Sequence, residues 1–124
     1  MKLLTHNMLT SKCLKGVNVG YPLGIIAKEI KVTEVEFNPK FISRMIPKMD
    51  WETVCKAAET IGHLNDLPQT VIEDYENNEE FLKKVHHVLL EVEVVDGELV
   101  CPETGRKFPV TDGIPNMLAN EDEI

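Results

Sequence analysis

The chain has 124 residues, which is the size of one ordinary domain. Its composition, 43% hydrophobic and 27% charged, is that of a globular protein and excludes a fibrous or disordered chain. The formal net charge is −8, and this acidity argues against nucleic-acid binding by the chain alone, because clustered Lys and Arg make most phosphate contacts. The sequence contains no apolar run long enough for a transmembrane helix, and its start lacks the apolar region of a signal peptide.

The charge is spread unevenly along the chain. Residues 1–35 carry a net charge of +3, residues 36–90 one of −4 and residues 91–124 one of −7. The basic start and the acidic end would attract one another if they lay side by side, although single surface ion pairs stabilise a fold by only about 0–1 kcal/mol. The three cysteines, Cys13, Cys55 and Cys101, are an odd number, which indicates reduced thiols in the cytosol or nucleus.

Residues 23–36 are rich in Ile and Val with partial alternation, which predicts a strand. Three amphipathic helices are expected next. Asn38 caps the first, which Pro47 ends; Asp50 caps the second, which Gly62 ends; Asn77 or Asn78 begins the third. Their apolar stripes are Phe41, Ile42, Met45 and Ile46; Val54, Ala57, Ala58 and Ile61; and Phe81, Leu82, Val85, Val88 and Leu89.

Residues 91–100 alternate between polar and apolar side chains and contain Asp96-Gly97, a strong hairpin signal. A further strand is expected at residues 107–110, after a turn at residues 103–105, and Asp112-Gly113 predicts another turn. Because a two-stranded hairpin is marginal alone, we expect these strands to join the N-terminal one in a sheet. The sequence therefore predicts an α+β fold, with a β unit built from both chain ends and a helical insertion.

No nucleophile, phosphate-binding or zinc-protease motif occurs, so a self-sufficient enzyme is not expected. The segment 101–105, Cys-Pro-Glu-Thr-Gly, has the shape of a zinc knuckle, but Thr104 stands where a second thiolate belongs. Two interpretations stay open for Cys101: a buried apolar group in a metal-free turn, which we favour, or a zinc ligand completed by Cys13 or by histidines. Cys55 is expected to pack in its helix, and Trp51 to be a partly buried anchor or, less favoured, an interface residue.

Residues 113–118, Gly-Ile-Pro-Asn-Met-Leu, form an apolar segment interrupted by Pro115. Proline removes one ladder donor, so this segment fits an edge strand and not a central one. It either packs on its own domain or serves as a docking edge for a partner's sheet. The similar segment Tyr21-Pro22-Leu23 is expected to flank the same surface.

Several segments together resemble one family, the eukaryotic multifunctional methyltransferase subunits, over essentially the whole length. They are residues 1–7 (Met-Lys-Leu-Leu-Thr-His-Asn), 22–23 (Pro-Leu), 36–39 (Glu-Phe-Asn-Pro) with Phe41, 45–47 (Met-Ile-Pro), 86–87 (His-His) with 89–91 (Leu-Leu-Glu), 101–106 (Cys-Pro-Glu-Thr-Gly-Arg) and 113–118.

The resemblance implies a non-catalytic activator of several S-adenosylmethionine-dependent methyltransferases that act on tRNA, rRNA and a translation release factor. It implies a zinc-ribbon-like β domain from residues 1–36 plus 91–124 and a three-helix insertion at residues 37–90. The subunit would add a strand to the methyltransferase sheet, cover its apolar surface as a heterodimer, and work in the cytoplasm and nucleus. The partner-binding residues would be Leu4, Tyr21, Pro22, Ile114, Pro115, Asn116, Met117 and Leu118.

In the metal-bearing branch of that family, four cysteines hold zinc. Their positions fall on Ser11, Gly16, Cys101 and Thr104, so the resemblance implies a branch without the metal and with no cofactor of its own. Cys13 lies near the first pair but out of register. The alternative function is a free-standing RNA- or ribosome-associated ribbon protein, suggested by the knuckle-like turn and the basic first third.

Overall fold

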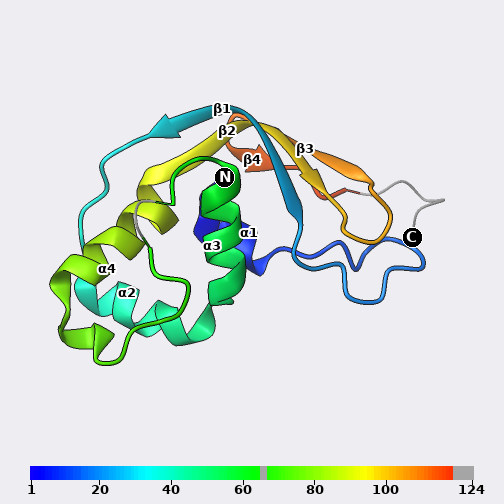
Figure 1. Cartoon of the computed structure of the whole chain (residues 1–124). Helices are drawn as coiled ribbons and strands as arrows, with labels where there is room; N and C mark the ends of the chain where they lie inside the picture. Colours follow the sequence, from blue (N-terminus) through cyan, green and yellow to red (C-terminus); the bar gives the residue numbers. More distant parts are fainter. Residues whose placement is uncertain (65–66, 119–124) are drawn as a thin grey trace.

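The computed structural model of the chain describes residues 1–64 and 67–118. Four antiparallel strands form a sheet in the order β1-β2-β3-β4, which arches over the helices (Figure 1). This arrangement confirms the predicted α+β class.

The elements in chain order are α1 (Leu3–Met8), β1 (Gly24–Val32), α2 (Pro39–Met45), the 3₁₀ turn η1 (Ile46–Lys48), α3 (Trp51–Thr60), the 3₁₀ turn η2 (Tyr75–Asn77), α4 (Glu79–His86), the π-helical turn η3 (His87–Glu91), β2 (Val92–Val100), β3 (Lys107–Thr111) and β4 (Ile114–Pro115).

The three predicted helices begin at the predicted caps. The side chains of Asn38, Asp50 and Asn78 each accept a hydrogen bond from the backbone amide three residues later, at 3.2, 3.2 and 3.0 Å. These bonds satisfy amides that a helix start leaves without a partner. At the end of α3, Gly62 has φ +78°, the left-handed conformation that glycine adopts without a steric penalty. The helix α2 ends at Met45, before Pro47 as predicted, and the 3₁₀ turn η1 then carries the chain through Pro47.

The helix α1 was not expected from the sequence. It has no side-chain cap, and Leu3, His6 and Asn7 are buried in it. Asn7 fixes α1 to the start of α3, since its amide group donates to the Asp50 carbonyl and accepts from the Asp50 amide, both at 3.0 Å. Tertiary contacts therefore hold a helix that is too short to be stable alone.

The predicted hairpin at Asp96-Gly97 is wrong, because β2 runs through both residues without turning. Ala27 pairs with Gly97 and Glu29 pairs with Asp96, so Lys28 is the extra residue of a β-bulge. A Cβ at position 97 would overlap the carbonyl oxygen of Ile26. Gly97 thus allows the backbones of β1 and β2 to approach closely, which is a known role of glycine within a strand.

The remaining strands follow the prediction more closely. β1 begins where expected but ends at Val32, before the predicted limit at residue 36. β3 and β4 are joined by the predicted turn at Asp112 and Gly113, whose φ angles are +51° and +76°. The core lies between the sheet and the helices, where the sheet arches over them (Figure 1). Its fully buried members include Leu99, Phe108 and Val110 from the strands and Ile42, Val54 and Val85 from the helices.

Candidate partner-binding surface

The segment after the β3–β4 turn forms the most exposed apolar surface near the C-terminal end of the described chain. Ile114 is 70% exposed and Leu118 is 81% exposed. A shallow hollow of about 630 Å³ is lined by Pro109 and Thr111 of β3 together with Ile114, Pro115, Asn116, Met117 and Leu118. We call these seven residues the docking surface. None of them is charged, and burial of such a surface by a partner would be favourable.

Local hydrogen bonds shape the docking surface. The amide of Asn116 donates to the Pro109 carbonyl at 2.9 Å, and the Asn116 side chain accepts from the Leu118 amide at 3.1 Å. Pro115 cannot donate to a neighbouring strand. Met117 is half-buried against the core, so the segment is anchored at one side chain while Ile114 and Leu118 stay exposed.

The structure brings five of the eight predicted partner-binding residues together here, Ile114 to Leu118. Leu4, Tyr21 and Pro22 are not among the residues that line this hollow. Leu4 is half-buried on α1, where it packs against the core. Tyr21 is also half-buried, and burial raises the pKa of its hydroxyl above its ordinary value. The binding role of all eight residues stays a prediction.

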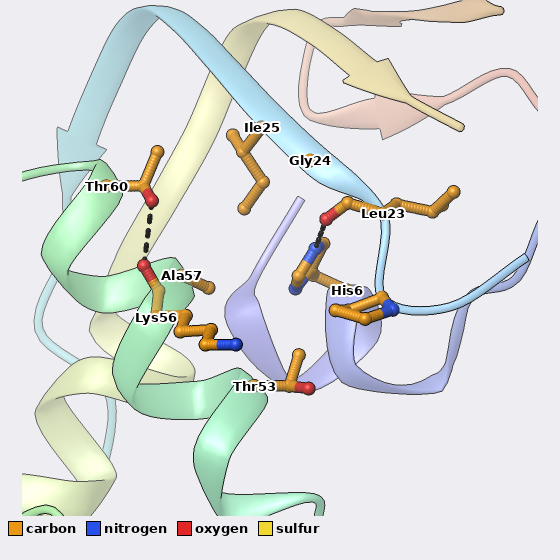
Figure 2. Close-up of a pocket in the computed structure, with 9 residues that line it drawn as sticks. His6, Leu23, Gly24, Ile25, Thr53, Lys56, Ala57 and Thr60 are labelled. Atoms are coloured by element: carbon orange, nitrogen blue, oxygen red, sulfur yellow. Dashed lines mark hydrogen bonds between the residues drawn. The ribbon is translucent and has the colours of Figure 1, made fainter. Parts of the chain in front are cut away.

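Pro22 instead lines a separate hollow of about 210 Å³ between α3 and the start of β1 (Figure 2). His6 reaches this hollow from α1, and its Nε2 lies 2.7 Å from the Leu23 carbonyl oxygen. Because a carbonyl only accepts, Nε2 carries the proton, and burial lowers the pKa of His6 below its ordinary value. The neutral ring joins α1 to the start of β1. The lining contains no carboxylate or thiol that could act with it in catalysis.

The knuckle-like turn holds hydroxyl groups where zinc ligands would stand. The Ser11 hydroxyl donates to the Cys101 thiol at 3.0 Å, and both residues are buried. Burial tends to raise the pKa of Cys101, but hydrogen bonds from Ser11 and Thr104 outweigh it and lower the pKa overall. Zinc requires about four thiolate, imidazole or carboxylate ligands, and the serine, glycine and threonine at three of the four positions do not fit it. Within residues 1–64 and 67–118, no three His, Cys, Asp or Glu side chains are grouped as a metal site needs.

The other singled-out side chains have structural contacts. The indole of Trp51 donates to the Pro68 carbonyl at 3.0 Å and packs against Phe81, with ring centroids 5.7 Å apart, as a partly buried anchor would. Cys55 is half-buried, and burial raises the pKa of its thiol, which makes it a poor nucleophile. Cys13 is exposed, and its sulfur lies 3.9 Å from the Met117 carbonyl oxygen.

Sequence reasoning missed three contributors to this region. Pro109 and Thr111 alternate with the buried Phe108 and Val110, so the period-two pattern of β3 was the signal that could have found them. The third is Glu103, whose carboxylate accepts hydrogen bonds from backbone amides of residues 18–20. These amides lower the pKa of Glu103 below its ordinary value. No local pattern indicates a contact across more than 80 residues.

Comparison with known proteins identifies the class. The family model described as Trm112p-like protein matches residues 2–113, so the chain belongs to the Trm112p-like family. It is 52% identical to the multifunctional methyltransferase subunit TRM112-like protein of Mus musculus, over 99% of this chain and 98% of the relative. It is 48% identical to homolog A of Arabidopsis thaliana, over the full length of both, and 30% identical to the TRM112 subunit of Saccharomyces cerevisiae, over 95% of this chain and 96% of the relative.

Solved structures show the same fold. A chain in the E. cuniculi Mtq2–Trm112 complex, described as responsible for methylation of the eRF1 translation termination factor, matches with a TM-score of 0.53 and 17% identity. The match covers 95% of each chain. Within the described part of the chain, no helix has the length and apolar character needed to cross a membrane.

Proposed function

We propose that this chain is a non-catalytic activator subunit of S-adenosylmethionine-dependent methyltransferases. The observation that carries this proposal is the family membership, with full-length identity to curated methyltransferase subunits. The solved relative in complex with Mtq2 supports a heterodimer with a methyltransferase chain. By the same relationship, we propose partners that modify tRNA, rRNA and a release factor, and work in both cytoplasm and nucleus.

The docking surface is our candidate for the contact with the methyltransferase. Among residues 1–64 and 67–118, β4 pairs only with β3, which leaves its other side for a strand of the partner sheet. We propose strand addition there, with Ile114, Met117 and Leu118 covered by apolar side chains of the partner. Leu4, Tyr21 and Pro22 belong to the proposed interface as a flanking contact.

The finer architecture is part of the proposal. Residues 1–36 plus 91–124 would form a zinc-ribbon-like domain without zinc, and residues 37–90 a helical insertion. The hydroxyl groups of Ser11 and Thr104 support a metal-free turn, as does the direct contact of Ser11 with Cys101. The methyl donor would be bound by the partner, so this chain needs no cofactor.

The mechanism of activation follows from thermodynamic linkage. A subunit that binds only the folded methyltransferase stabilises it by RT ln(1 + [L]/Kd), which is about 2.7 kcal/mol at a concentration 100 times Kd. Coverage of an exposed sheet edge also removes a site of aggregation. The activator therefore raises activity without contributing a reacting group.

Co-expression with a methyltransferase catalytic chain tests this function. We expect a soluble one-to-one complex that binds S-adenosylmethionine, whereas the isolated subunit neither binds the donor nor transfers a methyl group. Methyl transfer by the pure subunit would contradict the proposal. Tight, strongly salt-dependent RNA binding by the isolated chain, without a methyltransferase complex, would instead support the RNA-associated alternative.

A further inference from the structure

Two segments distant in the sequence meet beside the docking surface: the loop of residues 9–23, between α1 and β1, and the turn of residues 101–106, between β2 and β3 (Figure 1). In the metal-bearing branch of the family zinc would join such segments, whereas this sequence resembles the branch without the metal. Here Ser11, Gly16 and Thr104 do not fit a zinc site. Some other contact must therefore hold the loop to the turn.

The carboxylate of Glu103 makes this contact. Its Oε1 accepts a hydrogen bond from the Asn18 amide at 3.1 Å, and its Oε2 accepts from the Val19 and Gly20 amides at 2.9 and 2.6 Å. Three successive amides directed at one anionic group form a backbone anion-binding concavity. Bonds from amides to a charged acceptor are stronger than those between neutral groups.

A second set of contacts, at Gly20 and Ser11, adjoins the hydrogen bonds of Glu103. Gly20 has φ +60°, and a Cβ there would clash with Ser11, so only glycine allows these backbones to approach. The Ser11 amide donates to the Gly20 carbonyl at 2.9 Å, and the Ser11 hydroxyl donates to the Cys101 thiol. Glu103, Gly20, Ser11 and Cys101 thus close a ring of contacts that joins the loop to the turn.

The loop held in this way reaches the docking surface. Cys13, two residues after Ser11, places its sulfur 3.9 Å from the Met117 carbonyl oxygen. Leu14 is buried, and Val17 and Met117 pack against the same core. A loop released from the turn would lose this position beside Met117.

We propose that Glu103 is a positioning residue for partner binding: its carboxylate cross-links the loop to the turn, in place of a metal, and so holds the loop against the docking surface. This inference rests on the proposed function, since it assigns Glu103 a role in the same interface. Glu103 itself does not line the docking surface.

Amide hydrogen exchange on the isolated subunit tests the cross-link without any partner. In Glu103→Ala we expect the amides of residues 18–20 to exchange at least about tenfold faster, because they lose their acceptor. Glu103→Gln retains one oxygen and should show a smaller increase. The amides of α3 should be unchanged in both. Glu59→Ala is the matched control, because the exposed Glu59 carboxylate on α3 has no hydrogen bond or ion pair with the described residues. Unchanged exchange at residues 18–20 in Glu103→Ala would overturn the cross-link.

Partner affinity and its rescue test the positioning role. We expect Glu103→Ala to weaken binding of the methyltransferase chain about tenfold, and Glu59→Ala to leave it unchanged. In a Cys13→Ser background, Ser11→Cys places a second sulfur against Cys101, and oxidised glutathione can accept the two electrons released when the disulfide forms. The oxidised Glu103→Ala, Ser11→Cys protein should recover the affinity, and reduction should remove it again.

The outcomes separate this inference from the proposed function. If the wild-type subunit binds no methyltransferase, the proposed function fails, while the exchange experiment still reports on the cross-link. If the wild type binds and Glu103→Ala binds equally well, the positioning role fails and the proposed function stands. A loss of affinity that the disulfide does not restore would also contradict positioning, since it would indicate a different cause.

Discussion

The sheet has two edges, and they differ in length, in charge and in the regularity of strand pairing. β1, at one edge, is nine residues long, and Lys28, Glu29 and Lys31 are exposed along it. β4, at the other edge, is two residues long and continues into an uncharged apolar segment that ends at Leu118. The longer edge carries a bulge at Lys28, and the shorter edge carries none.

This difference makes β4, although it is the shorter strand, the better candidate for strand addition. Lysines and bulges are the features by which natural sheets prevent unwanted strand addition. β1 has both, although it offers more backbone groups. β4 has neither, and Ile114 within it and Leu118 after it are the two most exposed large apolar side chains of the described chain. We therefore expect the partner at β4 and no partner at β1.

The strongest test replaces one exposed isoleucine at each edge. Ile114→Asp should weaken methyltransferase binding at least about 100-fold, because it places a charge where apolar contact is expected. Met117→Asp should have a similar effect. Both can be measured by co-purification and then by titration calorimetry.

The matched control is Ile26→Asp on β1, where the native side chain is 42% exposed. It should leave binding unchanged and the fold intact. If Ile26→Asp abolished binding while Ile114→Asp did not, the two edges would have the opposite roles.

The second prediction concerns Gly97 of β2, which pairs with Ala27 beside the bulge in β1. Gly97→Ala should reduce the free energy of unfolding by about 2 kcal/mol, because the new Cβ would overlap the Ile26 carbonyl and force the strands apart. Gly24→Ala is the control, since its Cβ would meet Val100 at 3.5 Å, an ordinary contact. Urea denaturation of both variants measures the difference; equal stability of the two would refute a strict need for glycine at position 97.

The same glycine shows where sequence reasoning reached its limit. Asp96-Gly97 has the composition of a hairpin turn, and only the approach of β1 from 70 residues away gives Gly97 its different role. By contrast, the caps at Asn38, Asp50 and Asn78 were predicted correctly, because capping depends on residues within one turn of helix.

For the candidate surface, too, the sequence indicated the features that depend on local patterns and missed those that depend on long-range contacts. The apolar, uncharged stretch from Ile114 to Leu118 was visible in the sequence as an edge segment. Glu103 was not, because its three acceptor contacts are made with amides more than 80 residues earlier. Local patterns therefore indicated the surface, while its support depends on the tertiary fold.

The third prediction concerns the segment that follows β1, which Glu91 of η3 holds through Val35. The Glu91 carboxylate accepts from the Val35 amide at 3.0 Å and lies 2.9 Å from His87 Nδ1. Burial tends to raise the pKa of Glu91, but the Val35 amide and the histidines outweigh it and lower the pKa overall. Glu91→Gln should cost about 1 kcal/mol of stability at neutral pH.

The pH dependence of this cost has a defined sign. Because the folded pKa is lowered, the stabilisation by Glu91 is complete above the ordinary glutamate pKa of about 4.3 and is lost as the pH falls toward the folded pKa. The gap between wild type and Glu91→Gln should therefore narrow in acid. Glu79→Gln, at an exposed pair with Lys83, should show a smaller cost throughout.

The smallest expected effect comes from removing the lysine charges along β1. Lys28→Thr with Lys31→Thr should change the free energy of unfolding by less than about 0.5 kcal/mol, because both side chains are exposed. Lys40→Thr with Lys48→Thr, on α2 and η1, removes the same charge away from the edge and serves as the control. Sedimentation velocity should detect weak self-association only for the β1 variant.

If both double variants remain monomeric, the bulge at Lys28 is sufficient to protect the edge, because it interrupts the regular spacing that a second strand would need. If both self-associate, the loss of two lysine charges is responsible and the position on β1 has no special role. Self-association of the β1 variant alone would show that the lysine charges, together with the bulge, prevent strand pairing at β1. The shorter edge, β4, has neither feature and can pair with a partner strand.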